Sequence, residues 1–316
     1  MTNNSPNQVE DRITFAEAKK HVSEMNLINN FLFDSTLEKE DEAKVVAGNI
    51  LKSIFNREFK DIIVFSQKQF NAIDTPFHSI RLDIYISENT VDKSVTATIY
   101  NMEMEDRIAD KKNLPKRNRF YGALHDSKLL ESGTDYDELP DFISITISSY
   151  DPFNAGDMCY VAKTVLTSHP NLGYQDGLTH IYLYCNGKPN IDALSPFVSN
   201  ATHSKKLQEM LQYILTGEKP NSSNPDIDDI DMIVAKVKQR GEVTTEYMRQ
   251  WERENLIAKD AKIEAKKEDA LEMIRLGRKG NLPDETIVDS IRSIGLNDDI
   301  IDELFKKIDA ESVVSC

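Results

Sequence analysis

Two neighbouring segments of this 316-residue chain alternate between apolar and polar side chains, and this pattern restricts the possible fold more than any other. The first segment, residues 80–86, reads IRLDIYI, and the second, residues 95–104, reads VTATIYNMEM. Because residues two apart on a strand share a face, alternation of this kind predicts two β-strands. The polar stretch 87–94 between them suits a turn, so the two segments together predict a hairpin.

The predicted hairpin brings acidic side chains together. If its turn centres near Lys93, Asp83 lies opposite Glu103, with Cβ atoms about 5 Å apart. Two carboxylates at that distance repel each other unless a positive charge lies between them. Mg²⁺ or Mn²⁺, which prefer oxygen ligands, would supply that charge and could activate a water molecule for hydrolysis. The same register places Arg81 opposite Glu105, so an ordinary cross-strand salt bridge is the alternative interpretation.

A basic segment follows the second predicted strand directly. Residues 107–128 contain seven basic and two acidic residues, although the whole chain has a net charge of -15. That overall charge argues against a protein whose main task is to coat nucleic acid. Within the basic segment, Lys116, Arg117 and Arg119 are candidates for contact with DNA phosphates, because guanidinium groups pair well with phosphate oxygens. A solvated helix face is the alternative.

The remaining patterns predict an α/β fold followed by a helical extension. Apolar residues at helical spacing occur within 13–59, and β-rich runs recur along the chain up to about residue 186. Beyond an acidic stretch with two prolines, the composition favours long helices. The expected organisation is a disordered lead at 1–12, an α/β domain at 13–217, a linker at 218–229 and a helical C-terminal region at 230–316.

Several functional classes lack support in the sequence. Its apolar runs are too short to cross a bilayer, and the N-terminus lacks the features of a signal peptide. Cys159, Cys185 and Cys316 are odd in number and widely spaced, which predicts thiols in a reducing cytoplasm and no zinc site. No glycine-rich phosphate loop is present, so no nucleotide cofactor is expected. The acidic C-terminal helices favour protein contact, with a homo-oligomer as the expected form.

Several short motifs follow one another in a recognisable order. They are FLFD at 31–34, RLDIY at 81–85, IYNMEM at 99–104, PKRNRFY at 115–121, GTDYDELP at 133–140 and SYDPF at 149–153. Together they resemble the recombination-promoting nuclease/transposase family, which belongs to the PD-(D/E)XK nuclease superfamily. The likeness covers roughly residues 25–217, and the C-terminal part is similar to the variable tail of that family.

This resemblance implies a restriction-endonuclease-like core, in which helices flank a mixed sheet. It implies a Mg²⁺- or Mn²⁺-dependent DNA endonuclease that is linked to recombination or transposition. Asp83 and Glu103 would be the metal ligands, with the backbone carbonyl of Met104 as a third contact. Asp83, Glu103 and Glu105 would form the catalytic group. Glu42 would be either an accessory acid or a solvated charge on a helix.

Glu105 departs from the pattern of the family, which has Gln or Lys at this position. An ionised carboxylate cannot donate a hydrogen bond, so Glu105 cannot orient an attacking water as a lysine would. The alternative function is therefore a catalytically impaired protein that keeps the nuclease fold and serves as a module for DNA binding or protein assembly.

Overall fold

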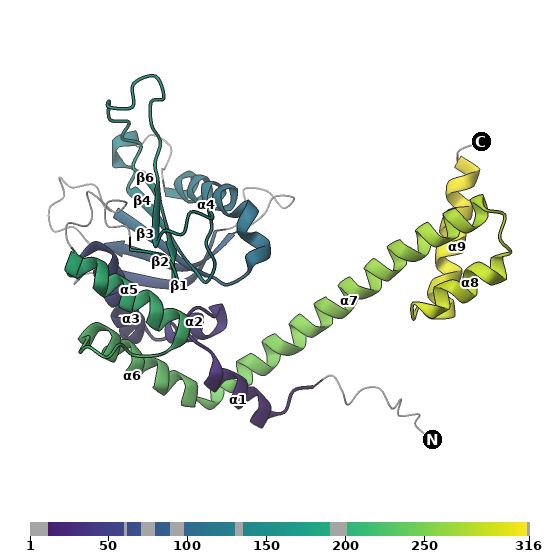
Figure 1. Ribbon diagram of the computed structural model, residues 1–316, viewed down its shortest axis with the longest axis horizontal. Coiled ribbons are helices and arrows are strands. Elements are labelled where there is room, and N and C mark those ends of the chain that lie inside the picture. The colour runs from purple at the N-terminus through teal and green to yellow at the C-terminus, as the bar shows by residue number, and fades with distance from the viewer. Residues whose placement is uncertain are drawn as a thin grey trace. The chain divides into compact units, whose positions relative to one another are not determined.

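The computed structural model describes residues 12–59, 62–70, 80–88, 98–129, 135–189 and 201–314. Within its strands, the side chains of residues 66–70, 80–83 and 88 lie outside the description. Contacts divide the chain into two units. One unit runs from Lys19 to Thr244, and the other combines Met1–Ala18 with Thr245–Cys316. Figure 1 shows both units.

A six-stranded mixed sheet forms the centre of the Lys19–Thr244 unit. Its strands are β1 (Ile62–Phe70), β2 (Ile80–Glu88), β3 (Thr98–Glu105), β4 (Asp141–Ser148), β5 (Cys159–Ala162) and β6 (Leu178–Tyr184). They lie in the order β1-β2-β3-β4-β6-β5. The central strands β3, β4 and β6 are parallel, whereas β1, β2 and β5 pair antiparallel with their neighbours.

Helices flank this sheet (Figure 1). The flanking helices before and after it in the chain include α2 (Asn30–Thr36), α3 (Glu40–Phe55), α5 (Ala201–Thr216) and α6 (Pro225–Gln239). Helix α1 (Phe15–Glu24) precedes them and crosses the boundary between the two units. Helix α3 contacts α2, α5 and α6, and the ring of Phe55 at its end lies 5.5 Å from that of Tyr100 in β3. The predicted combination of a mixed sheet with flanking helices is therefore confirmed.

The predicted hairpin has the predicted register. Ile84 of β2 pairs with Met102 of β3, and Ile86 pairs with Tyr100. This is the pairing expected for a turn centred near Lys93, which itself lies outside the described residues. Register follows from the alternation because a slip of one residue would turn every apolar side chain to the opposite face.

A crossover connection joins the parallel strands β3 and β4, as parallel pairing requires. It contains the short 3-10 helices η1 (Ile108–Asn113) and η2 (Tyr136–Glu138) on either side of α4 (Leu114–Leu129). Leu124 of α4 packs into a cluster with Tyr85, Ile99 and Phe142 from three strands. Helix α4 thus contains most of the basic segment at 107–128, and it covers the face of the sheet opposite α3.

The boundary between the units lies further along the chain than the predicted linker at 218–229. Helix α6 begins inside that segment, with Pro225 in its first turn. Lys52 of α3 binds Asp226 at 2.8 Å, and Arg240, just after α6, binds Glu42 at 2.6 Å. These ion pairs attach α6 to the α/β unit. The stretch resembled a loop because proline and acidic residues suit turns as well as the first turn of a helix.

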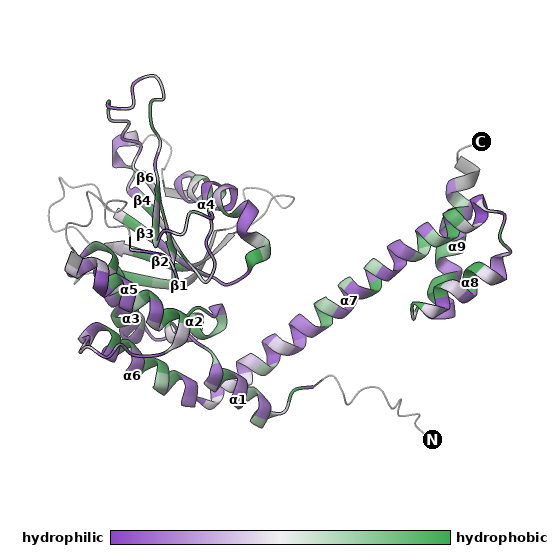
Figure 2. Cartoon of the chain, viewed as in Figure 1, coloured by the Kyte–Doolittle hydropathy of each residue, from purple (hydrophilic) through white to green (hydrophobic). Residues whose placement is uncertain are grey.

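The C-terminal unit contains most of α7 (Gly241–Lys279) together with α8 (Asp284–Ser293) and α9 (Asp298–Val314). Its buried core consists of Ala270, Ile274, Ile287, Ile291, Leu296, Ile301, Leu304 and Ile308. Asn297 caps α9, since its side chain accepts a hydrogen bond from the Ile300 N–H at 3.0 Å. Hydrophilic residues cover much of α7 (Figure 2), and no helix in the described ranges is long and apolar enough to cross a membrane.

Two cysteines are buried in the sheet. Cys159 begins β5, and Cys185 directly follows β6. Burial raises the pKa of each thiol to about 12, and nearby acids act in the same direction. Both cysteines therefore stay protonated at neutral pH.

Candidate functional site

The end of β3 places Glu103 and Glu105 on the face of the sheet beneath α4. Met102 and Met104 alternate with them and are almost fully buried. The two acids are also buried, with only 6% and 4% of their surface exposed. The alternation predicted from the sequence is thus confirmed, but acidic strand faces are ordinarily exposed, and this one is not.

Arg117 of α4 reaches both carboxylates. Its Nη2 lies 3.6 Å from Glu103 Oε2 and donates a hydrogen bond to Glu105 Oε2. The remaining carboxylate oxygens have neutral partners: Asn101 Nδ2 donates to Glu103 at 3.2 Å, and the Arg107 N–H donates to Glu105 at 3.0 Å. One guanidinium therefore serves two buried acids, and the group keeps an excess of negative charge when both are ionised.

Burial and the neighbouring charges together shift the pKa values of Glu103 and Arg117. Burial raises the pKa of Glu103 to about 7, while Arg117 and Asn101 act against that rise and Glu105 adds to it. For Arg117, burial alone would lower the pKa, but the two carboxylates raise it above its usual value. Arg117 thus remains a cation, and Glu103 can gain or lose a proton near neutral pH.

Polar side chains continue along the same face. Asn118 of α4 donates to Thr146 Oγ1 of β4 at 3.1 Å. Three buried atoms here have no hydrogen-bond partner in the described part of the chain, namely Asn101 Oδ1, Asn118 Oδ1 and Arg117 Nε. Because buried polar atoms are normally satisfied, unpartnered atoms around two acids suit a site for water or a polar ligand.

The other half of the predicted metal site is only partly described. Asp83 lies in β2 directly before Ile84, the partner of Met102, but its side chain and that of Arg81 fall outside the description. Tyr85, two residues later, has its hydroxyl 3.3 Å from His125 Nε2 of α4. Among described side chains, no group of three or more His, Cys, Asp or Glu is arranged to hold a metal ion.

The residues predicted to contact phosphate separate into two kinds. Lys116 and Arg119 are exposed on α4, whereas Arg117 turns inward to the acids. The sequence suggested Arg81 as the partner of Glu105 and did not connect Glu105 with Arg117. The connection between the parallel strands β3 and β4 could have indicated this contact. A helix in such a connection packs across one face of the sheet, which here is the face that carries the two acids.

Glu42 takes part in a different contact. Lys236 and Arg240 both donate hydrogen bonds to its carboxylate, at 2.8 Å and 2.6 Å for Oε1. Burial by itself would raise the pKa of Glu42, but these two cations hold it below its usual value. Glu42 joins α3 to α6 and is buried, so it is not a solvated charge, and its part as an accessory acid stays a prediction.

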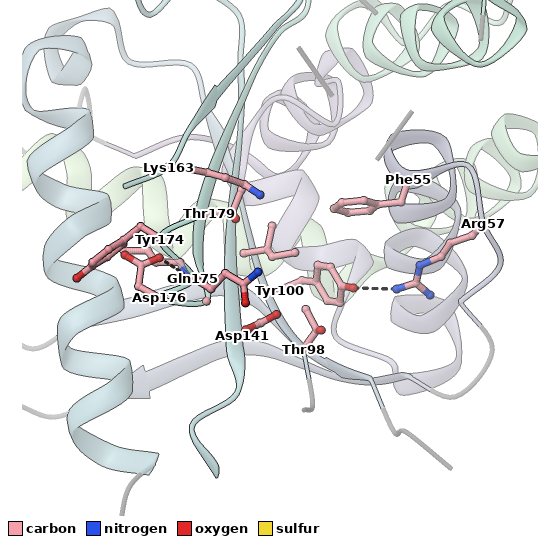
Figure 3. Close-up of a pocket in the computed structure, with 13 residues that line it drawn as sticks. Phe55, Arg57, Thr98, Tyr100, Asp141, Lys163, Tyr174, Gln175, Asp176 and Thr179 are labelled. Carbon is pink, nitrogen blue, oxygen red and sulfur yellow. Dashed lines mark hydrogen bonds between the residues drawn. The ribbon is translucent and has the colours of Figure 1, made fainter. Parts of the chain in front are cut away.

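A cavity of about 690 Å³ lies at the opposite ends of the central strands (Figure 3). Asp141 and Leu178, the first residues of β4 and β6, line it together with Tyr100, and Arg57 donates to the Tyr100 hydroxyl at 2.8 Å. Burial raises the pKa of Asp141, although Lys163 opposes the rise. None of the residues predicted to be functional lines this cavity.

Comparisons of the chain with known protein families, with curated proteins and with solved structures found no match. Support for a function therefore comes from the chain's own residues, and the resemblance in its motifs stays a hypothesis.

Proposed function

We propose that this chain is a divalent-metal-dependent DNA endonuclease that hydrolyses phosphodiester bonds. The observation that carries the proposal is the buried group of Glu103, Glu105 and Arg117. The register of the hairpin supports it, because Ile84 pairs with Met102 and the adjacent residue in β2 is Asp83. Burying two carboxylates lowers the stability of the fold unless their charge is compensated, and one arginine compensates only part of it. Buried acids of this kind are often found where a protein carries out chemistry.

Asp83 and Glu103, with the carbonyl of Met104, would hold Mg²⁺ or Mn²⁺, which would polarise the phosphodiester and lower the pKa of a bound water. Carboxylate and carbonyl oxygens are the ligands that these ions prefer, so the donor set fits them. Glu103 must lose its proton to act as a ligand. Arg117 can hold a phosphate oxygen in addition to Glu105, since a guanidinium offers five N–H donors.

The restriction-endonuclease-like core belongs to the same proposal. Its support is the mixed sheet with helices on its faces, and the position of the acids at the end of the central strand β3. A link to recombination or transposition follows from the motif resemblance, as does DNA as the substrate. Lys116 and Arg119, both exposed on α4, would contact its backbone.

A catalytically impaired nuclease-fold protein that serves DNA binding or protein assembly is the second candidate. Arg117 favours it, because its charge already offsets the acids that would otherwise attract a metal ion. Calorimetric titration with Mn²⁺ separates the candidates. Saturable binding that disappears in Asp83→Asn supports the nuclease, and no binding by the folded wild-type protein leaves the second candidate.

Cleavage of supercoiled plasmid tests the activity directly. With Mg²⁺ or Mn²⁺ we expect the wild-type protein to nick the plasmid, and Asp83→Asn and Glu103→Gln to reduce the rate about a hundredfold or more, because each removes a charged metal ligand. Asp137→Asn and Glu138→Gln make the same chemical changes at exposed positions in η2 and should leave the rate unchanged. Cleavage that persists in both site variants would contradict the assignment.

A further inference from the structure

A groove of about 460 Å³ opens beside the buried acids. Its lining includes Ile108, Lys111, Lys112, Pro115, Pro152 and Phe153. One wall comes from η1 and the start of α4, and the other from the loop after β4. These segments leave the sheet where Glu105 and Ser148, the last residues of β3 and β4, pair with each other. The groove thus lies at the same end of the strands as Glu103 and Glu105.

The loop that carries Phe153 is held by one carboxylate. Asp151 accepts hydrogen bonds from the backbone N–H groups of Phe153 and Asn154, both at 2.9 Å, and from that of Gly156 at 2.7 Å. Lys111 then joins the two walls, since its Nζ donates to Asn154 Oδ1 at 2.5 Å. A groove fixed in this way loses little conformational entropy when a ligand binds.

The ring of Phe153 is held by two neighbouring rings and is still partly exposed to solvent. Its ring centroid lies 5.0 Å from that of Tyr160 and 5.0 Å from that of Tyr182, both in edge-on geometry. The side chain is nevertheless 43% exposed, and Ile108 on the facing wall is 68% exposed. An aromatic ring in a fixed position beside lysines is the combination that binds unpaired nucleic acid, through base stacking and phosphate contacts.

We propose that this groove binds an unpaired strand of nucleic acid, with a base on Phe153 and backbone phosphates near Lys111 and Lys112. The inference rests on the proposed nuclease and adds the form of substrate that it takes. Charge supports this occupant, because the groove belongs to the basic stretch of an otherwise acidic chain. In an intact duplex the bases are stacked on one another, so none can reach Phe153 without being unpaired.

Fluorescence anisotropy with short labelled oligonucleotides tests the groove in EDTA, which prevents metal-dependent cleavage. The probes are a DNA strand, an RNA strand of the same sequence and the DNA duplex. We expect the single strands to bind more tightly than the duplex, and Phe153→Ala to weaken their binding about tenfold. The matched control is Phe120→Ala on α4, where the side chain is 42% exposed outside the groove lining.

Salt dependence tests the lysine contact separately. Lys112→Gln should reduce the slope of log affinity against log salt by about 0.7, the value for one phosphate contact on a single strand. Lys39→Gln, at an exposed position before α3, should not change the slope. The relative affinity of the DNA and RNA strands then identifies which of them the groove prefers.

Equal affinity for duplex and single strands, or the same affinity in Phe153→Ala as in Phe120→Ala, would overturn the proposal. A change of oligomeric state in Phe153→Ala without weaker strand binding would assign the groove to a second copy of the chain instead. Strand binding that needs Phe153, without cleavage of either the plasmid or the single strand by the wild type in Mg²⁺ or Mn²⁺, keeps the groove and rejects the nuclease. Cleavage that needs Asp83 but is unchanged in Phe153→Ala keeps the nuclease and rejects the groove.

Discussion

Glu103 is buried beneath α4, and its side chain can lose a proton near neutral pH. Its pKa is raised in the folded protein, mainly by burial, so the folded state holds this proton more tightly than the unfolded state does. The stabilisation is complete below the unfolded pKa of about 4.5 and is lost as pH rises through about 7.

Glu103→Gln should therefore change how stability depends on pH. Because glutamine cannot ionise, we expect the variant to lose less stability than the wild type between about pH 5 and pH 8, by on the order of 1–3 kcal/mol. Urea unfolding in metal-free buffer at several pH values measures this difference. Glu138→Gln, exposed in η2, is the control, and parallel pH profiles for wild type and Glu103→Gln would contradict the coupling.

The residues of the site differ in how far the sequence could predict them. Alternation predicted that Glu103 and Glu105 share a face, and the turn position predicted the register of β2 and β3, because both are local properties of strands. The partner of these acids was not local. Arg117 reaches Glu105 only through the path of the crossover, and its predicted role at a DNA phosphate assumed an outward side chain.

At the scale of secondary-structure elements, the contact between α3 and α6 depends on a buried charge. Glu42 is 9% exposed and binds Arg240, which is also 9% exposed. When one member of such a pair is removed, the other is left without compensation, which costs more than a surface ion pair contributes.

Arg240→Gln should lower the free energy of unfolding by about 3 kcal/mol at neutral pH. Lys236→Gln, which removes the more exposed partner of Glu42, should cost less than about 1 kcal/mol. The pKa of Glu42 is lowered, so the wild-type pair stabilises the protein above the unfolded pKa and loses this effect as pH falls. Urea unfolding at neutral and acidic pH should show a smaller acid-dependent loss in Arg240→Gln, and an equal loss would contradict the ion pair.

Elements with clear local signals were predicted well. The alternating segment at 80–86 lies within β2, and residues 98–104 of the second alternating segment lie within β3. Helix α6 shows the limit of such signals. Pro225 and its acidic neighbours fit a linker and a helix start equally, and only ion pairs to Lys52 and Glu42, more than 170 positions away in sequence, decide between the two.

At the scale of the whole molecule, the chain has two cores of different kinds. The core of the Lys19–Thr244 unit lies on both faces of a sheet, whereas the C-terminal unit depends on a small cluster of aliphatic side chains from α7, α8 and α9. A small core has few contacts to spare, so each of its side chains accounts for a large part of its stability.

Ile291→Ala should therefore loosen the C-terminal unit while leaving the sheet intact. Ile291 is fully buried, and truncating such a side chain costs about 2–4 kcal/mol. We expect faster hydrogen exchange of backbone amides in α8 and α9, and unchanged exchange in β3 and β4. Asp302→Asn, exposed on α9, should alter neither region. Faster exchange in both units at once would mean that the chain unfolds as one cooperative body.

The buried thiols of Cys159 and Cys185 allow the rate at which the sheet opens to be measured. An alkylating reagent attacks only a thiolate that it can reach, and in the folded sheet neither condition holds for these two residues. Each molecule can therefore be modified at the start of β5 and just after β6 only while this part of the sheet is open. The rate at which label accumulates at these cysteines is then a clock for the opening of the sheet, built into the natural sequence and readable by mass spectrometry under native conditions.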